Sequence, residues 1–441
     1  MDDPGQNQYR PRVVRKTLMH VCVVAAVIAM SLLAGDGCRA EQKPWPLWES
    51  YVKGFIDQQG RVIDHTGGDR TTSEAQAYAM FFALVANDRA HFDKLLAWTQ
   101  SNLAQGDLTE RLPAWNWGKT ADGQWKVLDP NSASDADLWM TYDLLEAGSL
   151  WHDAGYTKIG TAMAERIAKQ EVALLPPSCA AGPLLLPAPQ GFHPDDYTWI
   201  MNPSYAPLPV LQYLATRMPQ GPWGAMVQEL PRFYNHTSTA GYAPDWSKCI
   251  AGQGWVPTPA PGQQPTQGQA GQKGAASAPP AVPATPAAAA IIPGAQPAAT
   301  QPVPPPTSIG SFDAIRVYLW LGISDPDAPE VQASLESFHG MAAYLSHNAI
   351  PPRTVDNSGS VKNAEGPLSF SAAVIPYLQV LGQKAAAKAQ MDRLAGGLDK
   401  GSGLYGSPAY YYDQNMALFA NGWMEKRYRI EKDGSLKLKW K

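Results

Sequence analysis

The sequence predicts an all-α fold, a closed toroid of six helical hairpins with minor β structure. Apolar residues recur at helical spacing through most of the chain, whereas strand signals are few and short, near 124–128 and 427–438. A spacer at 251–308 leaves seven helical segments before it and five after it, which does not divide the chain into two equal domains. We therefore expect one domain of twelve helices, with the spacer as an insertion. The expected helices are 45–57, 73–86, 90–104, 134–152, 156–174, 204–218, 222–236, 311–322, 327–347, 369–382, 384–396 and 408–424.

The first 40 residues have the pattern of an export signal. Four basic residues at positions 10–16 precede an apolar run at 21–34, and the run is followed by Cys38-Arg39-Ala40. The run is shorter than the ~20 residues that a membrane-spanning helix needs. We expect cleavage after residue 40, a mature chain at 41–441 without membrane insertion, and a periplasmic or secreted location.

Two cysteines, Cys179 and Cys249, lie outside this signal. An exported protein meets an oxidising environment, in which the two can form a single disulfide. Two free thiols in separate loops are an equally good interpretation, and the sequence leaves both open.

Composition and charge exclude several classes of function. The 441 residues include 35 basic and 39 acidic ones, a formal net charge of −4. This balance gives no positive field for a phosphate backbone, so we expect no nucleic-acid partner. The histidines form no HxxH or HExxH pair and the chain has no phosphate-binding glycine motif, so the sequence predicts neither a metal nor a cofactor. Fifteen tryptophans favour a neutral, ring-shaped ligand that stacks on indole faces.

The spacer at 251–308 consists mainly of Pro, Ala, Gly and Gln. Such a composition cannot bury a core, so we expect this insertion to be disordered. It is either a surface loop whose length costs little free energy, or a segment that covers the site or tethers a partner. The low cost of loop length favours the first interpretation.

Three helical segments begin alike, with a Ser/Thr cap followed closely by a carboxylate. The carboxylates are Glu74, Asp135 and Asp313. Acidic residues are common in first turns because they cap the helix and match its dipole, so one such segment alone would indicate little. Here each carboxylate lies at the start of an apolar helix, as in the inner ring of a toroid. Such a ring would bring the three helix starts together at one end.

The motifs around these acids resemble those of glycoside hydrolase family 8, and in particular its periplasmic cellulases encoded with bacterial cellulose synthases. The resemblance runs from about Trp45 to Trp440 except for the spacer, and the Ala-Ser-Asp-Ala-Asp element at 133–137 is its most specific part. The motifs are Thr-Thr-Ser-Glu at 71–74, Arg-Leu-Pro-Ala-Trp-Asn-Trp-Gly at 111–118, Asn-Ser-Ala-Ser-Asp-Ala-Asp at 131–137, Asn-Pro-Ser-Tyr at 202–205 and Phe-Asp-Ala-Ile-Arg-Val-Tyr at 312–318.

The resemblance implies an (α/α)6 barrel, a single catalytic domain that hydrolyses β-1,4-glucans such as cellulose with inversion. By motif, Glu74 matches the proton donor, Asp313 the general base and Asp135 a third acidic residue. Inversion places the acid and the base roughly 6.5–9.5 Å apart, which leaves room for a water molecule. The resemblance also points to the cellulose synthase export machinery as a partner.

Substrate contacts are expected from aromatic and polar side chains near these acids. Tryptophans at 115–125 lie in a loop-like stretch where packing needs few large rings, and two tyrosines lie near the C-terminal helix. Arg316, one turn after Asp313, either holds that carboxylate ionised or forms an ordinary surface pair. The candidates for substrate binding are Trp115, Trp117, Asp137, Tyr205, Arg316, Tyr411 and Tyr412.

One departure from the family keeps other functions open. Phe312 precedes the expected base where relatives usually carry Tyr, so a hydroxyl that would position water is missing, unless Tyr205 replaces it. The first alternative is a family-8 hydrolase of xylan, chitosan or mixed-linkage glucan. The second is a catalytically weak glucan-binding or export accessory protein. A toroidal polysaccharide lyase is a third, and it would require a Tyr or His base.

Overall fold

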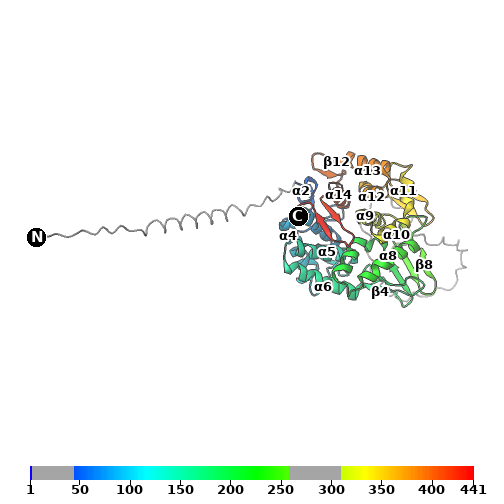
Figure 1. Ribbon diagram of the computed structural model, residues 1–441, viewed down its shortest axis with the longest axis horizontal. Helices are drawn as coiled ribbons and strands as arrows, with labels where there is room; N and C mark the ends of the chain where they lie inside the picture. The colour runs from blue at the N-terminus through cyan, green and yellow to red at the C-terminus, as the bar shows by residue number, and fades with distance from the viewer. Residues whose placement is uncertain (2–43, 258–308) are drawn as a thin grey trace. The chain divides into compact units, whose positions relative to one another are not determined.

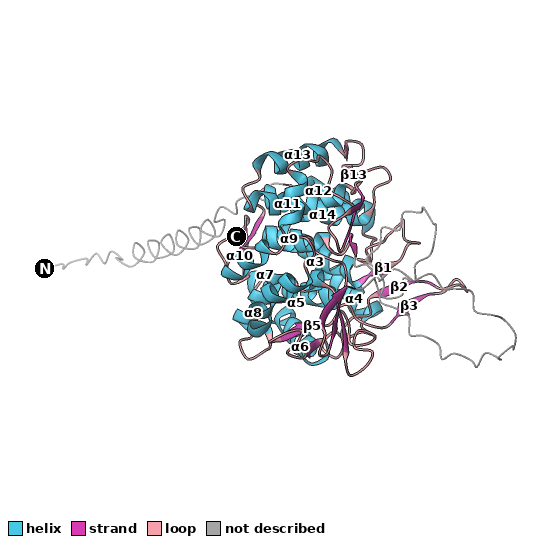
Figure 2. Ribbon diagram, turned by 90° about the vertical axis from the view of Figure 1, so that its right-hand side faces the viewer, coloured by secondary structure: helices cyan, strands magenta, loops and turns pink. Residues whose placement is uncertain are grey.

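Helices predominate among the residues that the computed structural model describes, which are Met1, 44–257 and 309–441 (Figure 2). The export signal expected at 1–40, apart from Met1, and residues 258–308 of the expected spacer lie outside this part of the chain. No helix in the described part combines the length and the apolar composition that crossing a membrane requires. The α-helices of this part are α2 (Pro46–Phe55), α3 (Ser73–Val85), α4 (Arg89–Leu103), α5 (Ser134–Leu150), α6 (Ala154–Gln170), α7 (Leu208–Arg217), α8 (Trp223–Thr237), α9 (Ile315–Ile323), α10 (Pro329–Glu336), α11 (His339–Leu345), α12 (Leu368–Val380), α13 (Lys384–Gly396) and α14 (Tyr411–Met424).

The prediction of a mainly helical fold is confirmed, although several helices begin or end at other residues than expected. The helix expected at 156–174 ends at Gln170, and residues 172–174 form the strand β4 (Val172–Leu174). The segment expected at 327–347 is two helices, α10 and α11, separated at Ser337 and Phe338. Residues 203–205 form the short 3₁₀ helix η1 (Pro203–Tyr205), and α7 starts only after Pro207, whose fixed φ suits a helix start. Helix α9 begins at Ile315, so that Asp313 lies in the preceding turn and not in the helix.

Six helices form a closed ring of contacts. Helix α3 contacts α5, α5 contacts α7, α7 contacts α9, α9 contacts α12, α12 contacts α14, and α14 returns to α3. Every residue of α3 and α9 is buried, which explains why their sequences show no polar face. The core of the ring is aromatic, with Trp139, Trp320 and Phe419 in mutual contact. These side chains therefore fill the interior of the ring of helices where they lie.

A second helix lies against each member of the ring. Helices α4, α6 and α8 contact α3, α5 and α7, while α10, α13 and α2 contact α9, α12 and α14. Figure 1 shows α6 beside α5 and α13 beside α12. These outer helices bury only some of their residues, as expected for helices with one face on a core and one face in water.

Strands are short and lie in small antiparallel sheets. The two expected strand regions are confirmed, as β3 and as the β14–β15 hairpin, whereas strands of two to four residues are too short to show an alternating pattern. Figure 2 shows β1–β3 on one side of the helices and the chain's C-terminal end on the other. The strands are β1 (Thr71–Thr72), β2 (Asn116–Lys119), β3 (Trp125–Asp129), β4 (Val172–Leu174), β5 (Pro183–Leu185), β6 (Thr198–Met201), β7 (Ser247–Ile250), β8 (Gly254–Pro257), β9 (Ile309–Gly310), β10 (Thr354–Asp356), β11 (Val361–Asn363), β12 (Leu398–Asp399), β13 (Leu404–Tyr405), β14 (Tyr428–Ile430) and β15 (Leu436–Leu438).

The first residues of the expected spacer belong to the fold. Residues 254–257 form β8, which pairs with β7, and the indole of Trp255 donates a hydrogen bond to Cys179 O at 2.8 Å. The start of the expected insertion at 251 is therefore corrected, because a tryptophan and a strand partner hold residues 251–257. Cys179 and Cys249 form a disulfide, which decides between the two interpretations that the sequence left open.

Candidate active site

One buried arginine binds all three of the carboxylates that the sequence singled out. The side chain of Arg316, in α9, is 1% exposed. Its Nη1 donates to Glu74 Oε2 and, at 3.0 Å, to Asp135 Oδ2, while its Nη2 donates to Asp313 Oδ1 at 3.1 Å. Glu74 and Asp135 are each the second residue of their helix, α3 and α5. The structure thus brings three acids that are far apart in sequence to one end of the ring.

Backbone hydrogen bonds join the starts of α3 and α5. Thr72 caps α3, because its hydroxyl accepts a hydrogen bond from Ala75 N at 3.2 Å. The next amide, of Ser73, donates to Trp115 O at 3.0 Å, and Trp115 N donates to Asn131 O at 2.7 Å. Asn131 lies three residues before α5. The positions of Glu74 and Asp135 are therefore coupled through the backbone of Trp115.

A second polar group holds Asp313 from the other side. Asn202 donates from Nδ2 to Asp313 Oδ2 at 3.1 Å, and its Oδ1 caps η1 by accepting from Ser204 N at 3.0 Å. The hydroxyl of Ser204 in turn accepts from Arg316 Nη2 at 3.0 Å. Sequence reasoning did not select Asn202 or Ser204, although both belong to the Asn-Pro-Ser-Tyr motif at 202–205.

Asp245 shapes the turn that carries Asp313. Its Oδ1 accepts hydrogen bonds from Ser311 N at 2.7 Å and Ala314 N at 2.8 Å. Burial, together with the negative charge of the neighbouring Asp313, raises the pKa of Asp245 to about 7. No sequence pattern pointed to this residue, which lies in a loop between α8 and β7.

Burial and charge compete over the protonation of Glu74. Burial raises the pKa of Glu74 to about 7; Arg316 opposes this change, and Asp135 and Asp313 add to it. Burial also raises the pKa of Asp135, against the effect of Arg316. A carboxyl group with a pKa near 7 holds its proton part of the time at neutral pH, which general acid catalysis requires.

A cavity of about 240 Å³ lies near these acids, although none of the three lines it. Its lining includes Phe312, the neighbour of Asp313, and Tyr411 and Tyr412 from the start of α14. Tyr411 Oη donates to Glu74 Oε1 at 3.4 Å, and Tyr412 Oη donates to Phe312 O at 2.7 Å. Both tyrosines that the sequence proposed as substrate contacts therefore line the cavity beside the acids.

The comparisons with known proteins agree with this geometry. A family model described as glycosyl hydrolases family 8 matches residues 18–262. The chain belongs to glycosyl hydrolase family 8. An endoglucanase of Xanthomonas axonopodis pv. citri (strain 306) is 37% identical over 97% of this chain and 98% of its own length. An endoglucanase of Escherichia coli (strain K12) is 38% identical over 94% of this chain and 96% of its own. The crystal structure of an endo-1,4-D-glucanase from Vibrio fischeri ES114 covers 90% of this chain and 99% of its own, with a TM-score of 0.69 and 32% identity.

The tryptophans proposed as sugar platforms in this family-8 chain differ in surroundings. Trp115, which directly precedes β2, is 6% exposed and lies next to the first residue of α3, because its carbonyl oxygen accepts a hydrogen bond from Ser73 N. Trp117 stacks on Trp125, with ring centroids 5.2 Å apart, and the guanidinium of Arg61 is 4.5 Å from its centroid. Neighbouring side chains thus cover part of the Trp117 ring, whereas Trp125 is 43% exposed.

The other two candidates for substrate binding, Tyr205 and Asp137, are buried. The ring of Tyr205 lies 5.4 Å from the guanidinium carbon of Arg316 and is 5% exposed. Asp137 lies in the first turn of α5, is fully buried, and is in hydrogen-bond contact with Glu171 at the end of α6. Within the described part of the chain, no group of His, Cys, Asp or Glu side chains is arranged to hold a metal ion.

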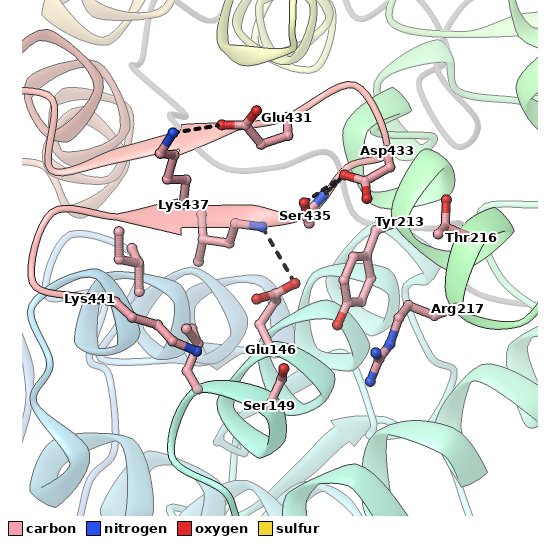
Figure 3. Close-up of a pocket in the computed structure, with 13 residues that line it drawn as sticks. Glu146, Ser149, Tyr213, Thr216, Arg217, Glu431, Asp433, Ser435, Lys437 and Lys441 are labelled. Atoms are coloured by element: carbon pink, nitrogen blue, oxygen red, sulfur yellow. Dashed lines mark hydrogen bonds and ion pairs between the residues drawn. The ribbon is translucent and has the colours of Figure 1, made fainter.

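A larger cavity, of about 500 Å³, lies at the opposite end of α5 (Figure 3). It is lined by Glu146 of α5, by Tyr213 and Arg217 of α7, and by the β14–β15 hairpin. Glu146 lies eleven residues after Asp135, roughly 16 Å along the helix axis at 1.5 Å per residue. Burial raises its pKa to about 7 as well. Glu74, Asp135 and Asp313 therefore lie at the other end of α5 from this buried glutamate.

Proposed function

We propose that this family-8 chain is an endo-β-1,4-glucanase that cleaves cellulose chains with inversion at the anomeric carbon. The observation that carries the proposal is the set of three carboxylates held by Arg316 beside a cavity with room for a sugar ring. The relatives named endoglucanase, 37% and 38% identical over nearly the whole chain, support the substrate class. The closed ring of six helices and its outer partners support an (α/α)6 barrel as the scaffold.

In the proposed reaction, Glu74 is the general acid and Asp313 the general base. Glu74 donates its proton to the glycosidic oxygen as the bond to the anomeric carbon breaks. Asp313 takes a proton from a water molecule that attacks this carbon from the opposite face. Arg316 and Asn202, which donate to the two oxygens of Asp313, keep it oriented for this step.

Arg316 organises the acids in this proposal and does not bind sugar. Its side chain is almost fully buried, and its two terminal nitrogens are already bonded to carboxylates and to the Ser204 hydroxyl. Asp135, which shares Nη1 of Arg316 with Glu74, adds negative charge that favours the protonated form of the acid. A periplasmic or secreted location and a role beside the cellulose synthase export machinery rest on the sequence motifs.

The test is the release of reducing ends from carboxymethylcellulose, with xylan and chitosan in parallel. We expect Glu74→Gln to lower kcat by about 10²–10⁴-fold while oligosaccharide binding persists, because only proton donation is lost. Glu146→Gln is the matched control: it changes another buried glutamate with a raised pKa, at the far end of α5, and should keep wild-type activity. NMR of freshly released product should show the inverted anomer. A wild-type protein that releases no reducing ends from any β-glucan would refute the proposal.

A further inference from the structure

We propose that Asp137 and Glu171 form a buried carboxyl pair that shares one proton, and that this pair is a positioning device for Asp135 and Glu74. The inference rests on the proposed function, because positioning matters only if these acids catalyse. It gives Asp137 a role other than the substrate contact that the sequence suggested. Neither residue lines the cavity near the acids, and the described hydrogen bonds of Arg316 go to other side chains.

The contacts of the pair require a shared proton. Asp137 and Glu171 are both 0% exposed, and their carboxyl groups are in hydrogen-bond contact. Ser132 donates its hydroxyl proton to Glu171 Oε1. Ser132 also lies near Asp137, but its hydroxyl has a single proton, which Glu171 Oε1 accepts. Asp137 Oδ1 and Oδ2 and Glu171 Oε2 are therefore without a donor in the described structure. Two acceptor groups can hold this contact only if one of them carries hydrogen.

The surroundings favour one proton over none. Two adjacent carboxylates without solvent would be very costly, whereas a carboxyl bonded to a carboxylate leaves one charge and a strong hydrogen bond. Burial raises the pKa of Glu171 to about 8, and burial together with Glu171 raises the pKa of Asp137 well above its usual range. The ionisable neighbour that faces both is Asp135, whose charge disfavours a second negative charge on the pair. The proton is therefore retained through neutral pH.

The pair ties together the segments that carry the acids. Glu171 directly follows α6, Asp137 lies in the first turn of α5 two residues after Asp135, and Ser132 belongs to the loop before α5. From that loop the hydrogen bonds Trp115 N to Asn131 O and Ser73 N to Trp115 O continue to the residue before Glu74. Loss of the pair would therefore displace both acids, and a displacement of about 1 Å can cost about 10²-fold in rate.

Conservative and truncating variants separate positioning from substrate binding. Asp137→Asn can still donate to Glu171, and Glu171→Gln can still donate to Asp137, so both should keep kcat and KM for cello-oligosaccharides within threefold of wild type. Asp137→Ala should lower kcat about 10²-fold with KM within threefold, because the cavity is untouched. If Asn and Ala at 137 both raise KM, and Glu171→Gln leaves both constants unchanged, Asp137 binds substrate and the proposal is wrong.

Infrared difference spectroscopy tests the proton without relying on activity or on a variant that folds poorly. Wild type minus Asp137→Asn at pH 7 should show the carbonyl stretch of one neutral carboxylic acid. Its absence would overturn the shared proton even if Asp137→Ala does not fold. If the wild type hydrolyses no β-glucan but shows this band, the proposed function fails while the pair itself stands.

Discussion

At the scale of single residues, the protonation of Glu74 sets the pH range of the proposed reaction. The pKa of Glu74 is raised to about 7 by burial, and the acid must be protonated to act. We therefore expect kcat/KM for carboxymethylcellulose to fall tenfold per pH unit above about pH 7, because the deprotonated form cannot donate. A pH–rate profile from pH 4 to 10 checks this. An alkaline limb that begins below pH 5.5 would mean that another group controls the reaction.

A substitution of Asn202 tests whether its hydrogen bond to Asp313, the proposed general base, contributes to catalysis. Asn202→Ala removes the donor to Asp313 Oδ2 and the cap of η1. A hydrogen bond to a charged group contributes about 1.5–3 kcal/mol, so we expect kcat to fall about 10–100-fold. The control is Asn102→Ala, whose amide donates only to Trp98 O within α4 and which should leave kcat unchanged. An unchanged kcat in Asn202→Ala would remove Asn202 from the proposed mechanism.

The sequence predicted the three acids but not the groups that hold them. Glu74, Asp135 and Asp313 each follow a Ser or Thr residue, a pattern visible within a few residues of sequence. The expected cap itself forms only at Thr72, because Ala133 and Ala314 are the N-cap residues of α5 and α9. The contacts of Asp313 with Asn202 and of Asp245 with the turn at 311–314 join segments 66 to 111 residues apart. Such pairings depend on the closed ring of helices, and no local pattern records them.

At the scale of elements, the disulfide connects the small β6–β7–β8 sheet to the site. Cys249 lies in β7, β7 pairs with β6, and β6 ends one residue before Asn202. The bond closes a loop of 70 residues in sequence, so its loss should lower the free energy of unfolding by about 2–4 kcal/mol. Thermal unfolding with and without reductant measures this, and the double variant Cys179→Ser, Cys249→Ser should not respond to reductant. An equal midpoint in both conditions would contradict the prediction.

Helices were easier to predict than strands because of their length. The ring helices carry seven or more consecutive buried residues, so their apolar content is evident even without an amphipathic face. Strands of two to four residues have no room for alternation, and their pairing is set by partners such as Trp255 that lie elsewhere in the chain. The 3₁₀ helix at Pro203–Tyr205 was not predicted as a separate element, because the apolar pattern continues from it into α7.

At the scale of the whole molecule, the number of helices was the decisive sequence observation. Seven segments before the spacer and five after it suggested one domain, and the described residues between Trp45 and Lys439 form a single compact unit in which α3 contacts α14 and α7 contacts α9. What the sequence does not contain is the orientation of the helix starts. It is the closure of the ring that places one arginine between three acids.

Buried carboxyl groups at both ends of α5 should make the stability of the whole fold depend on pH. Glu74 and Glu146 have pKa values raised to about 7, and Glu171 to about 8, against about 4.5 in an unfolded chain. Because the folded state holds these protons more tightly, the stabilisation is fully present below pH 4.5 and is lost as pH rises to about 8. We expect the free energy of unfolding, from urea titrations at pH 5 to 9, to fall over this range.

A variant of Glu146 tests this prediction. In Glu146→Gln the decrease in the free energy of unfolding should be smaller by about 1–3 kcal/mol, since an amide cannot ionise. The exposed Glu49→Gln should leave the slope as in wild type. A Glu146→Gln variant with the full wild-type slope would show that Glu146 keeps its charge in the folded protein at neutral pH.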